Sequence, residues 1–181
     1  MKQCNNVYFI EADIGAVLSP DRDYRYSLWR IWQPDDPYAL FIGLNPSTAD
    51  EYENDPTIRR CIRFAKDWGF GGLYMANLFA IRATKPKIMK AHHAPIGIKN
   101  DVWLQDLARG AGVIVCAWGT HGSHQGRDQM VKALLSAYGL MCLGTTKDGH
   151  PKHPLYIKAV QQLVRYGNSS ASGLLSSSHR S

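Results

Sequence analysis

Residues 38–47 read Tyr-Ala-Leu-Phe-Ile-Gly-Leu-Asn-Pro-Ser, an apolar run that ends in a turn. The run predicts a buried strand, and the Asn45-Pro46 pair marks the turn. A second turn of this kind lies far downstream, where the strand-like residues 140–143 lead through a glycine-containing loop to His153. Because open α/β sheets bind ligands beyond the carboxyl ends of their strands, Asn45 and His153 are expected to share one site.

From residue 38 onward, strand-like and helix-like segments alternate. Apolar runs at 73–78, 113–118 and 140–143 predict three further strands. Helical spacing follows Asp55-Pro56 as far as Trp68, and recurs at about 98–108, at 125–138 and from Pro154 to Arg165, while 83–97 reads as a long loop. Crossovers of this length require a mostly parallel sheet with both faces covered. The sequence therefore predicts an α/β fold: a three-layer α/β/α sandwich around a four-stranded, mostly parallel sheet.

The two ends of the chain have a different character from this central part. Two alternating runs within residues 7–32, joined by turn residues at 19–23, predict an N-terminal β-hairpin. Residues 1–36 are therefore expected to be a hairpin extension packed on a main domain at 37–166. Residues 167–181 are rich in serine and too poor in apolar area to order themselves, which predicts a flexible tail.

Composition is that of a globular chain with one core. The 181 residues are 45% hydrophobic and 20% charged, and no apolar run approaches the roughly 20 residues of a membrane span. The N-terminus lacks the pattern of a secretory signal, so we expect a cytoplasmic, membrane-independent protein, with a monomer favoured. The four cysteines are widely spaced, which predicts no metal site; three of them fall among core residues and Cys4 is expected to be exposed.

Charge is unevenly distributed along the chain. Residues 1–60 hold 6 Lys and Arg against 10 Asp and Glu, whereas residues 61–181 hold 15 against 5. A basic later portion suits a phosphate-bearing partner such as DNA or a nucleotide, although a merely soluble basic protein has the same signature.

Four predicted strand ends carry distinctive turns, at Asn45, Asn77, Trp118-Gly119 and His153. An asparagine is no general base, but its amide can hold a water molecule in line for attack. Asn77 offers a donor and an acceptor, which suits the edge of a base. A histidine can donate a hydrogen bond to negative charge that develops on a leaving group. Together these turns predict hydrolysis or recognition of a base.

Each of these residues also has a structural alternative. Asn45 before Pro46 is a common turn starter, and Asn77 can simply satisfy backbone groups at a strand end. Trp118 suits a core or a pocket wall. His121 and His124 have a spacing that a metal site can use, although a polar loop near phosphate is the favoured interpretation.

The stretches GLNPSTAD, DPTIRRC, NLFAIRAT, AWG and HPLY resemble a bacterial and phage family of domains of unknown function, number sixteen-forty-three, over nearly residues 17–165. More distantly, the order and spacing of the turns are similar to the uracil-DNA glycosylase superfamily. In that superfamily a first strand ends in a G-x-[DN]-P turn, a second in a base-reading Asn, a third in W-G, and the last strand precedes an H-P turn.

The second resemblance implies an N-glycosidic bond hydrolase that acts on uracil or a modified base and needs no cofactor or metal. Asn45 would orient the water, Asn77 would read the base, and His153 would stabilise the departing base anion. Tyr52 or Phe79 is a candidate for stacking on the base. The chain departs from the superfamily at Ser47, where Gly or Tyr is usual, and after His153-Pro154, where Leu155-Tyr156 replaces a serine.

Further candidates surround these residues. Substrate contacts are expected from Gly43, Leu44, Pro46, Ser47, Asp50, Phe79, Gly119 and Tyr156, and phosphate contacts from Arg59, Arg82, Lys85, His121, Arg127 and Lys152. Arg59 has the alternative of pairing with a nearby carboxylate.

Four carboxylates at residues 50–55 make an awkward neighbour for DNA phosphate and leave two rival functions open. One is a metal-assisted enzyme for a free modified nucleotide, with Asp50 and Asp55 as ligands, although Asp55 also fits a helix N-cap. The other is a module that binds a modified base without catalysis.

Overall fold

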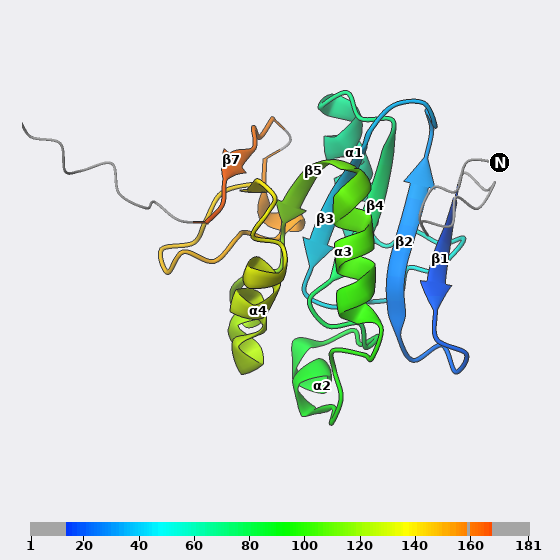
Figure 1. The fold of residues 1–181 in the computed structure, drawn as a ribbon, viewed down its shortest axis with the longest axis vertical. Coiled ribbons are helices and arrows are strands. Elements are labelled where there is room, and N and C mark those ends of the chain that lie inside the picture. Colours follow the sequence, from blue (N-terminus) through cyan, green and yellow to red (C-terminus); the bar gives the residue numbers. More distant parts are fainter. Residues whose placement is uncertain (1–13, 159, 168–181) are drawn as a thin grey trace, which may run out of the picture.

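The computed structural model describes residues 14–158 and 160–167. Seven strands form one mixed sheet in the order β1-β2-β4-β3-β5-β6-β7 (Figure 1). They are β1 (Ile14–Leu18), β2 (Arg25–Ile31), β3 (Tyr38–Gly43), β4 (Gly72–Asn77), β5 (Ala111–Cys116), β6 (Leu140–Cys142) and β7 (Val164–Arg165). Strands β4, β3, β5 and β6 run parallel, which is the four-stranded core that the alternating pattern predicts.

The predicted hairpin is present and extends the same sheet. Strands β1 and β2 pair antiparallel, and β2 then pairs antiparallel with β4, with Leu28 opposite Met75. The expected run at residues 7–10 lies outside the described residues, as do Cys4 and residues 168–181 of the expected tail.

Helices cover both faces of the sheet. Helix α1 (Pro56–Asp67) buries Ile58, Cys61 and Phe64 against one face. On the other face lie α3 (Asn100–Gly110) and α4 (Arg127–Leu134), which bury Leu104 and Val131. Figure 1 shows α3 in front of the sheet, running roughly along the direction of the strands. In the part of the chain that the structure describes, no helix is long and apolar enough to span a membrane.

Three segments differ from the sequence-based expectation. The long loop at 83–97 contains a short helix, α2 (Pro86–Ala91), and α4 follows a 3-10 segment (Thr120–Gly126). The helix expected from Pro154 to Arg165 is wrong, because only Pro154–Tyr156 forms a single 3-10 turn. Residues 164–165 instead form β7, which pairs with β6, and the pairing allows Tyr166 to be buried edge-on against Trp118.

The two neighbours of β3 run parallel to it, so the carboxyl ends of all three strands lie at one edge of the sheet. The chain crosses over from β3 to β4, which lies on one side of β3. The next strand in the sequence, β5, lies on the other side of β3. The carboxyl ends of β3, β4 and β5 therefore diverge around a crevice, the position at which open α/β sheets bind ligands.

A buried asparagine fixes the carboxyl end of β4. Asn100, at the start of α3, is fully buried, and its Nδ2 donates to the carbonyl oxygens of Asn77 and Leu78 at 2.9 and 3.0 Å. These two bonds hold the turn that carries the Asn77 side chain.

Asn100→Ala is expected to lower the free energy of unfolding by about 1–3 kcal/mol, because the buried carbonyl oxygens of Asn77 and Leu78 each lose a hydrogen bond from Nδ2, although that of Leu78 keeps the one from Arg127. Chemical denaturation measures the change. Gln105→Ala, on the exposed face of the same helix, is the matched control and should change stability by less than about 0.5 kcal/mol. Equal stabilities of the two variants would contradict this role of Asn100.

Candidate active site at the carboxyl edge of the sheet

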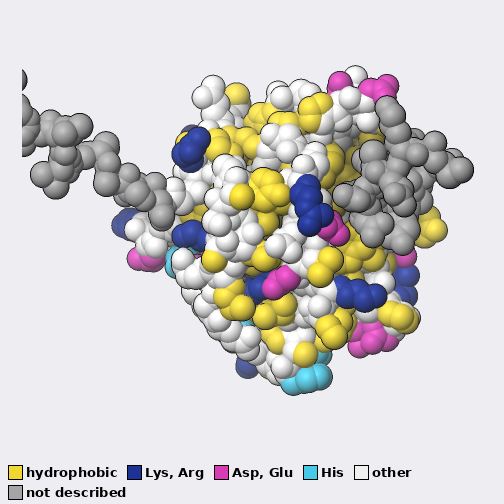
Figure 2. Space-filling model, in the orientation of Figure 1, with side chains coloured by type: hydrophobic (Ala, Val, Ile, Leu, Met, Phe, Trp, Pro, Cys, Tyr) yellow, Lys and Arg dark blue, Asp and Glu magenta, His cyan; other side chains and the backbone are white. Residues whose placement is uncertain are grey.

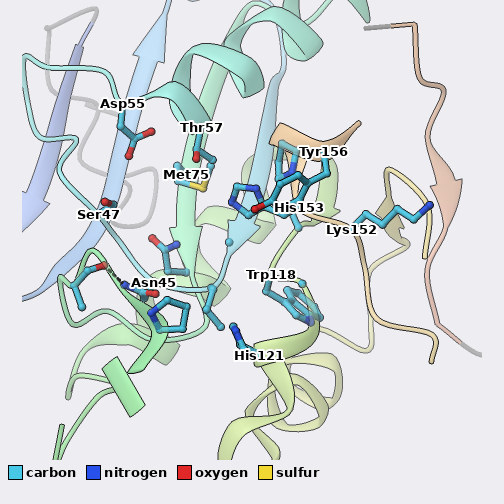
Figure 3. Close-up of a pocket in the computed structure, with 18 of the residues that line it drawn as sticks. Asn45, Ser47, Asp55, Thr57, Met75, Trp118, His121, Lys152, His153 and Tyr156 are labelled. Carbon is cyan, nitrogen blue, oxygen red and sulfur yellow. Dashed lines mark hydrogen bonds between the residues drawn. The ribbon is translucent and has the colours of Figure 1, made fainter. Parts of the chain in front are cut away.

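A cavity of about 720 Å³ lies at the carboxyl ends of the parallel strands, within the size range of ligand sites. Its lining brings together residues from the four turns singled out in the sequence (Figure 3). Eleven predicted site residues line it: Gly43, Leu44, Asn45, Ser47, Asn77, Trp118, Gly119, His121, Lys152, His153 and Tyr156. Asn45 and His153, which the sequence analysis expects at one site, both line this cavity.

In the Asn45 amide the Nδ2 group is hydrogen-bonded and the Oδ1 atom is available to a ligand. Its Nδ2 donates to the carbonyl oxygens of Pro46 and Ala83, at 2.9 and 2.7 Å. These bonds pin the turn after β3 to the segment that leads into α2. Within the described residues nothing donates to its Oδ1, so this oxygen remains as an acceptor at the cavity wall. An acceptor held in this way can orient a water molecule through one of its hydrogens.

Asn77, the last residue of β4, forms the cavity wall beside Gly43 of β3. It is 4% exposed, and its Oδ1 accepts from Nη2 of Arg25 at 3.3 Å. A Cβ atom added at Gly43 would lie 2.9 Å from Nδ2 of Asn77, so the glycine allows the amide to approach the strand. Arg25 itself lines the cavity from β2 and also donates to the carbonyl oxygen of Ala49 at 2.8 Å.

His153 lies in the turn before the last 3-10 segment, with its ring tilted against that of Tyr156 (Figure 3). Its Nδ1 accepts from the backbone N–H of Leu155 at 3.4 Å, which places the proton of the neutral ring on Nε2. Burial lowers the pKa of His153 below its ordinary value of 6.5, and the charge of Asp55 opposes this shift. The imidazole is therefore neutral near pH 7 and offers one donor.

Trp118 and Gly119 form a wall. The Trp118 ring is 2% exposed, and a Cβ atom at Gly122 would lie 2.1 Å from it. Gly119 has φ 70° and ψ −167°, a conformation that is essentially restricted to glycine, and it donates to the carbonyl oxygen of Pro151 at 2.9 Å. This contact joins the turn after β5 to the turn that presents His153.

The acidic segment before α1 is largely engaged in local contacts. Asp50 accepts from the backbone N–H groups of Tyr52 and Glu53, which lower its pKa, and Glu51 forms a two-bond ion pair with Arg22. Asp55 caps α1 through the N–H of Ile58 at 2.9 Å. Of the four carboxylates only Asp55 lines the cavity, and the described residues contain no group of three metal-ligating side chains.

Seven predicted site residues lie outside the cavity lining, namely Pro46, Asp50, Arg59, Phe79, Arg82, Lys85 and Arg127. The structure gives two of them other roles. Phe79 is fully buried in the core and cannot stack on a ligand there. Arg127 is 1% exposed, donates to the carbonyl of Leu78 and pairs with Asp101, so it joins α4 to α3 and does not face a phosphate.

The remaining candidates are peripheral. Arg59 donates to the carbonyl oxygen of Asn54, with no carboxylate partner among the described residues. Arg82 donates to the carbonyl oxygen of Arg22, and Tyr52 is 77% exposed outside the lining. Lys85 lies exposed next to the lining residues Thr84 and Pro86.

The comparisons agree with the sequence motifs. The family model described as a protein of unknown function (DUF1643) matches residues 25–155. The chain belongs to this family. A search of the curated proteins and a search of the solved structures found no match. The matched DUF1643 region begins at Arg25 and ends at Leu155, so it includes the turns that carry Asn45, Asn77, Trp118 and His153.

Sequence reasoning missed Arg25 as a site residue of this DUF1643 domain. The signal was available, since Arg25 is a charged residue in the strand-like run 24–32, which is otherwise rich in aromatic and apolar residues. A cation within such a run either lies in solvent on an edge strand or is buried against polar partners. The sequence does not distinguish these two cases, because the pairing of β2 with β4 decides between them.

The lowered pKa of His153 makes stability depend on pH. The unfolded chain takes up this proton near pH 6.5, whereas the folded protein resists it to lower pH, so protonation favours unfolding as the pH falls. The free energy of unfolding should therefore decrease between pH 7 and pH 5, and His153→Gln should show a smaller decrease. Urea titrations at the two pH values test this. His93→Gln, at an exposed histidine, should behave like the wild type.

Proposed function

We propose that this chain hydrolyses the N-glycosidic bond of uracil or a modified base, in the manner of a DNA glycosylase. The observation that carries the proposal is the presence of Asn45, Asn77 and His153, from three separate turns, around one cavity. The resemblance of these turns to the uracil-DNA glycosylase superfamily gives the same three residues complementary roles. No cofactor is needed, because the charges to be stabilised are an electron-poor sugar and a departing base anion.

The geometry suits both the attack of water on the sugar and the departure of the base. The free Oδ1 of Asn45 accepts a hydrogen bond from water and directs the water oxygen at the anomeric carbon. As the carbon–nitrogen bond breaks, the base leaves with the electron pair, and the Nε2–H of neutral His153 donates to the developing anion. The attacking water forms the new carbon–oxygen bond and releases its proton to solvent or to the departing base.

Charge around the cavity favours a nucleic acid substrate. We call residues 82–93 and 144–158 the rims, because both segments contribute residues to the lining; of their Lys and Arg side chains only Lys152 itself lines the cavity. The first holds four Lys and Arg and no acidic residue, and the second holds three Lys and one Asp, so together they carry +6, equal to the formal charge of the whole chain. On the face that Figure 2 shows, Lys and Arg are scattered singly. A phosphate backbone is the natural partner for such rims.

The two rival functions predict other behaviour. A metal-assisted enzyme for a free modified nucleotide would lose activity in chelator, whereas the glycosylase would not. A binding module would show no turnover, so Asn45→Ala would change only its affinity for the base.

The decisive assay is alkaline strand cleavage after incubation with oligonucleotides that contain uracil, hypoxanthine, hydroxymethyluracil or mismatched thymine, single- and double-stranded, with chelator present. Base release is expected from at least one substrate. Asn45→Ala and His153→Ala should each lower the rate roughly 10²–10³-fold, because each removes a group that acts in the transition state. Gln105→Ala is the folded control with full activity. Absence of product from every substrate, where an established glycosylase is active, would reject the proposal.

Salt dependence tests the role of the rims. Lys85→Gln and Lys152→Gln should each weaken binding to a fluorescent oligonucleotide and reduce the slope of log K against log salt by roughly 0.7–0.9. Fluorescence anisotropy measures both quantities. Arg109→Gln, which removes an exposed cation at the end of α3, should leave the slope unchanged. Binding that does not respond to salt would count against a polyphosphate substrate.

A further inference from the structure

Arg25 is a buried cation without a carboxylate partner. Its side chain is 2% exposed, no ion pair to it occurs among the described residues, and its Nε is sealed from solvent with no acceptor. Burial lowers the pKa of Arg25 to about 10, which reflects the cost of keeping the charge there. A buried charge of this kind is expensive, so its retention at a cavity wall calls for an explanation.

The contacts of Arg25 explain why the charge is retained there. Its Nη1 donates to the carbonyl oxygen of Ala49 at 2.8 Å, which fixes the guanidinium, and its Nη2 donates to Oδ1 of Asn77 at 3.3 Å. A guanidinium has donors only, so the Asn77 amide must turn its oxygen toward Arg25. The Nδ2 group then lies on the other side, against Gly43, and has no acceptor within the described part of the chain.

We propose that Arg25 and Asn77 form a carbonyl-recognition subsite, in which Arg25 locks the Asn77 amide so that its NH2 group donates to a carbonyl oxygen of the bound base. The identity of the ligand as a base rests on the proposed function. Arg25 is a positioning residue that acts through Asn77. The subsite accepts a base with a carbonyl at the recognised position and rejects one with an amino group there, because two donors would face each other without an acceptor.

This proposal changes what Asn77 can recognise. A freely rotating amide presents either its oxygen or its nitrogen and does not distinguish a carbonyl from an amine. With Oδ1 held by Arg25, only the donor is offered, and the neighbouring positive charge polarises the amide so that the donor is stronger. Such a donor also favours a base on which negative charge accumulates as it leaves.

The test is the binding of free bases to the full chain in two matched pairs, uracil against cytosine and hypoxanthine against adenine. Within each pair one carbonyl is exchanged for an amine, and the adjacent ring N–H is exchanged for a bare ring nitrogen. Affinities come from NMR titrations that follow the Asn77 side-chain NH2 signal, assigned by its loss in Asn77→Ala. Wild-type protein is expected to bind the carbonyl member roughly tenfold more tightly, with a shift of the Asn77 signal.

Variants of Arg25 separate selectivity from simple structural damage. In Arg25→Met the amide is free to rotate, so the affinity ratio within each pair should fall toward one, whereas Arg25→Lys keeps a donor and should retain part of the ratio. Arg30→Met is the matched control, because Arg30 is also a buried arginine of β2 but donates to backbone carbonyls and to Oδ1 of Asn54, none of them in the cavity lining. It should leave the ratio unchanged.

The outcomes are distinct. A wild-type ratio near one, no binding of any base at millimolar concentration, or an unchanged ratio in Arg25→Met would overturn the subsite. Should Arg25→Met fail to fold, the wild-type ratio and Arg25→Lys still decide. A clear carbonyl preference in a protein that releases no base from DNA would reject the glycosylase proposal and leave the subsite standing.

Discussion

Burial of β3 on both faces is the constraint from which the rest of the architecture follows. All six of its residues are buried, and both of its edges are paired to parallel neighbours. A strand in that position needs helices above and below it, and parallel neighbours need long crossovers to supply them. The same crossovers bring the carboxyl ends of four strands to one edge, so the cavity is a consequence of how the core is covered.

The parts of this arrangement that depend on local pattern could be predicted from the sequence. The apolar run at 38–43, the Asp55 cap of α1 and the parallel core were all predictable, because each leaves a signal within a few residues. The convergence of Asn45 and His153 followed from the rule that parallel strands end at one edge. The last helix was not predictable, since its replacement by β7 depends on the burial of Tyr166 against a distant Trp118.

Side-chain roles were harder to predict than positions. Phe79 and Arg127 follow the right strands or turns, yet one is core and the other joins two helices. Which way such a side chain points depends on contacts between elements far apart in the sequence. Arg25 illustrates the converse case, because a strand expected to lie beside the main domain contributes a residue to the cavity wall.

The pairing of β2 with β4 bears on how the chain assembles as it is synthesised. Strand β2 leaves the ribosome well before β4, because β3 and α1 lie between them in the sequence. Until residues 72–77 arrive, one edge of the hairpin has no partner, and an open edge invites pairing with another chain. Arg25 and Arg30 are still hydrated during this interval, and charged side chains on an edge discourage such pairing. The two arginines that end up buried in the native sheet therefore place charge on this open edge before β4 covers it.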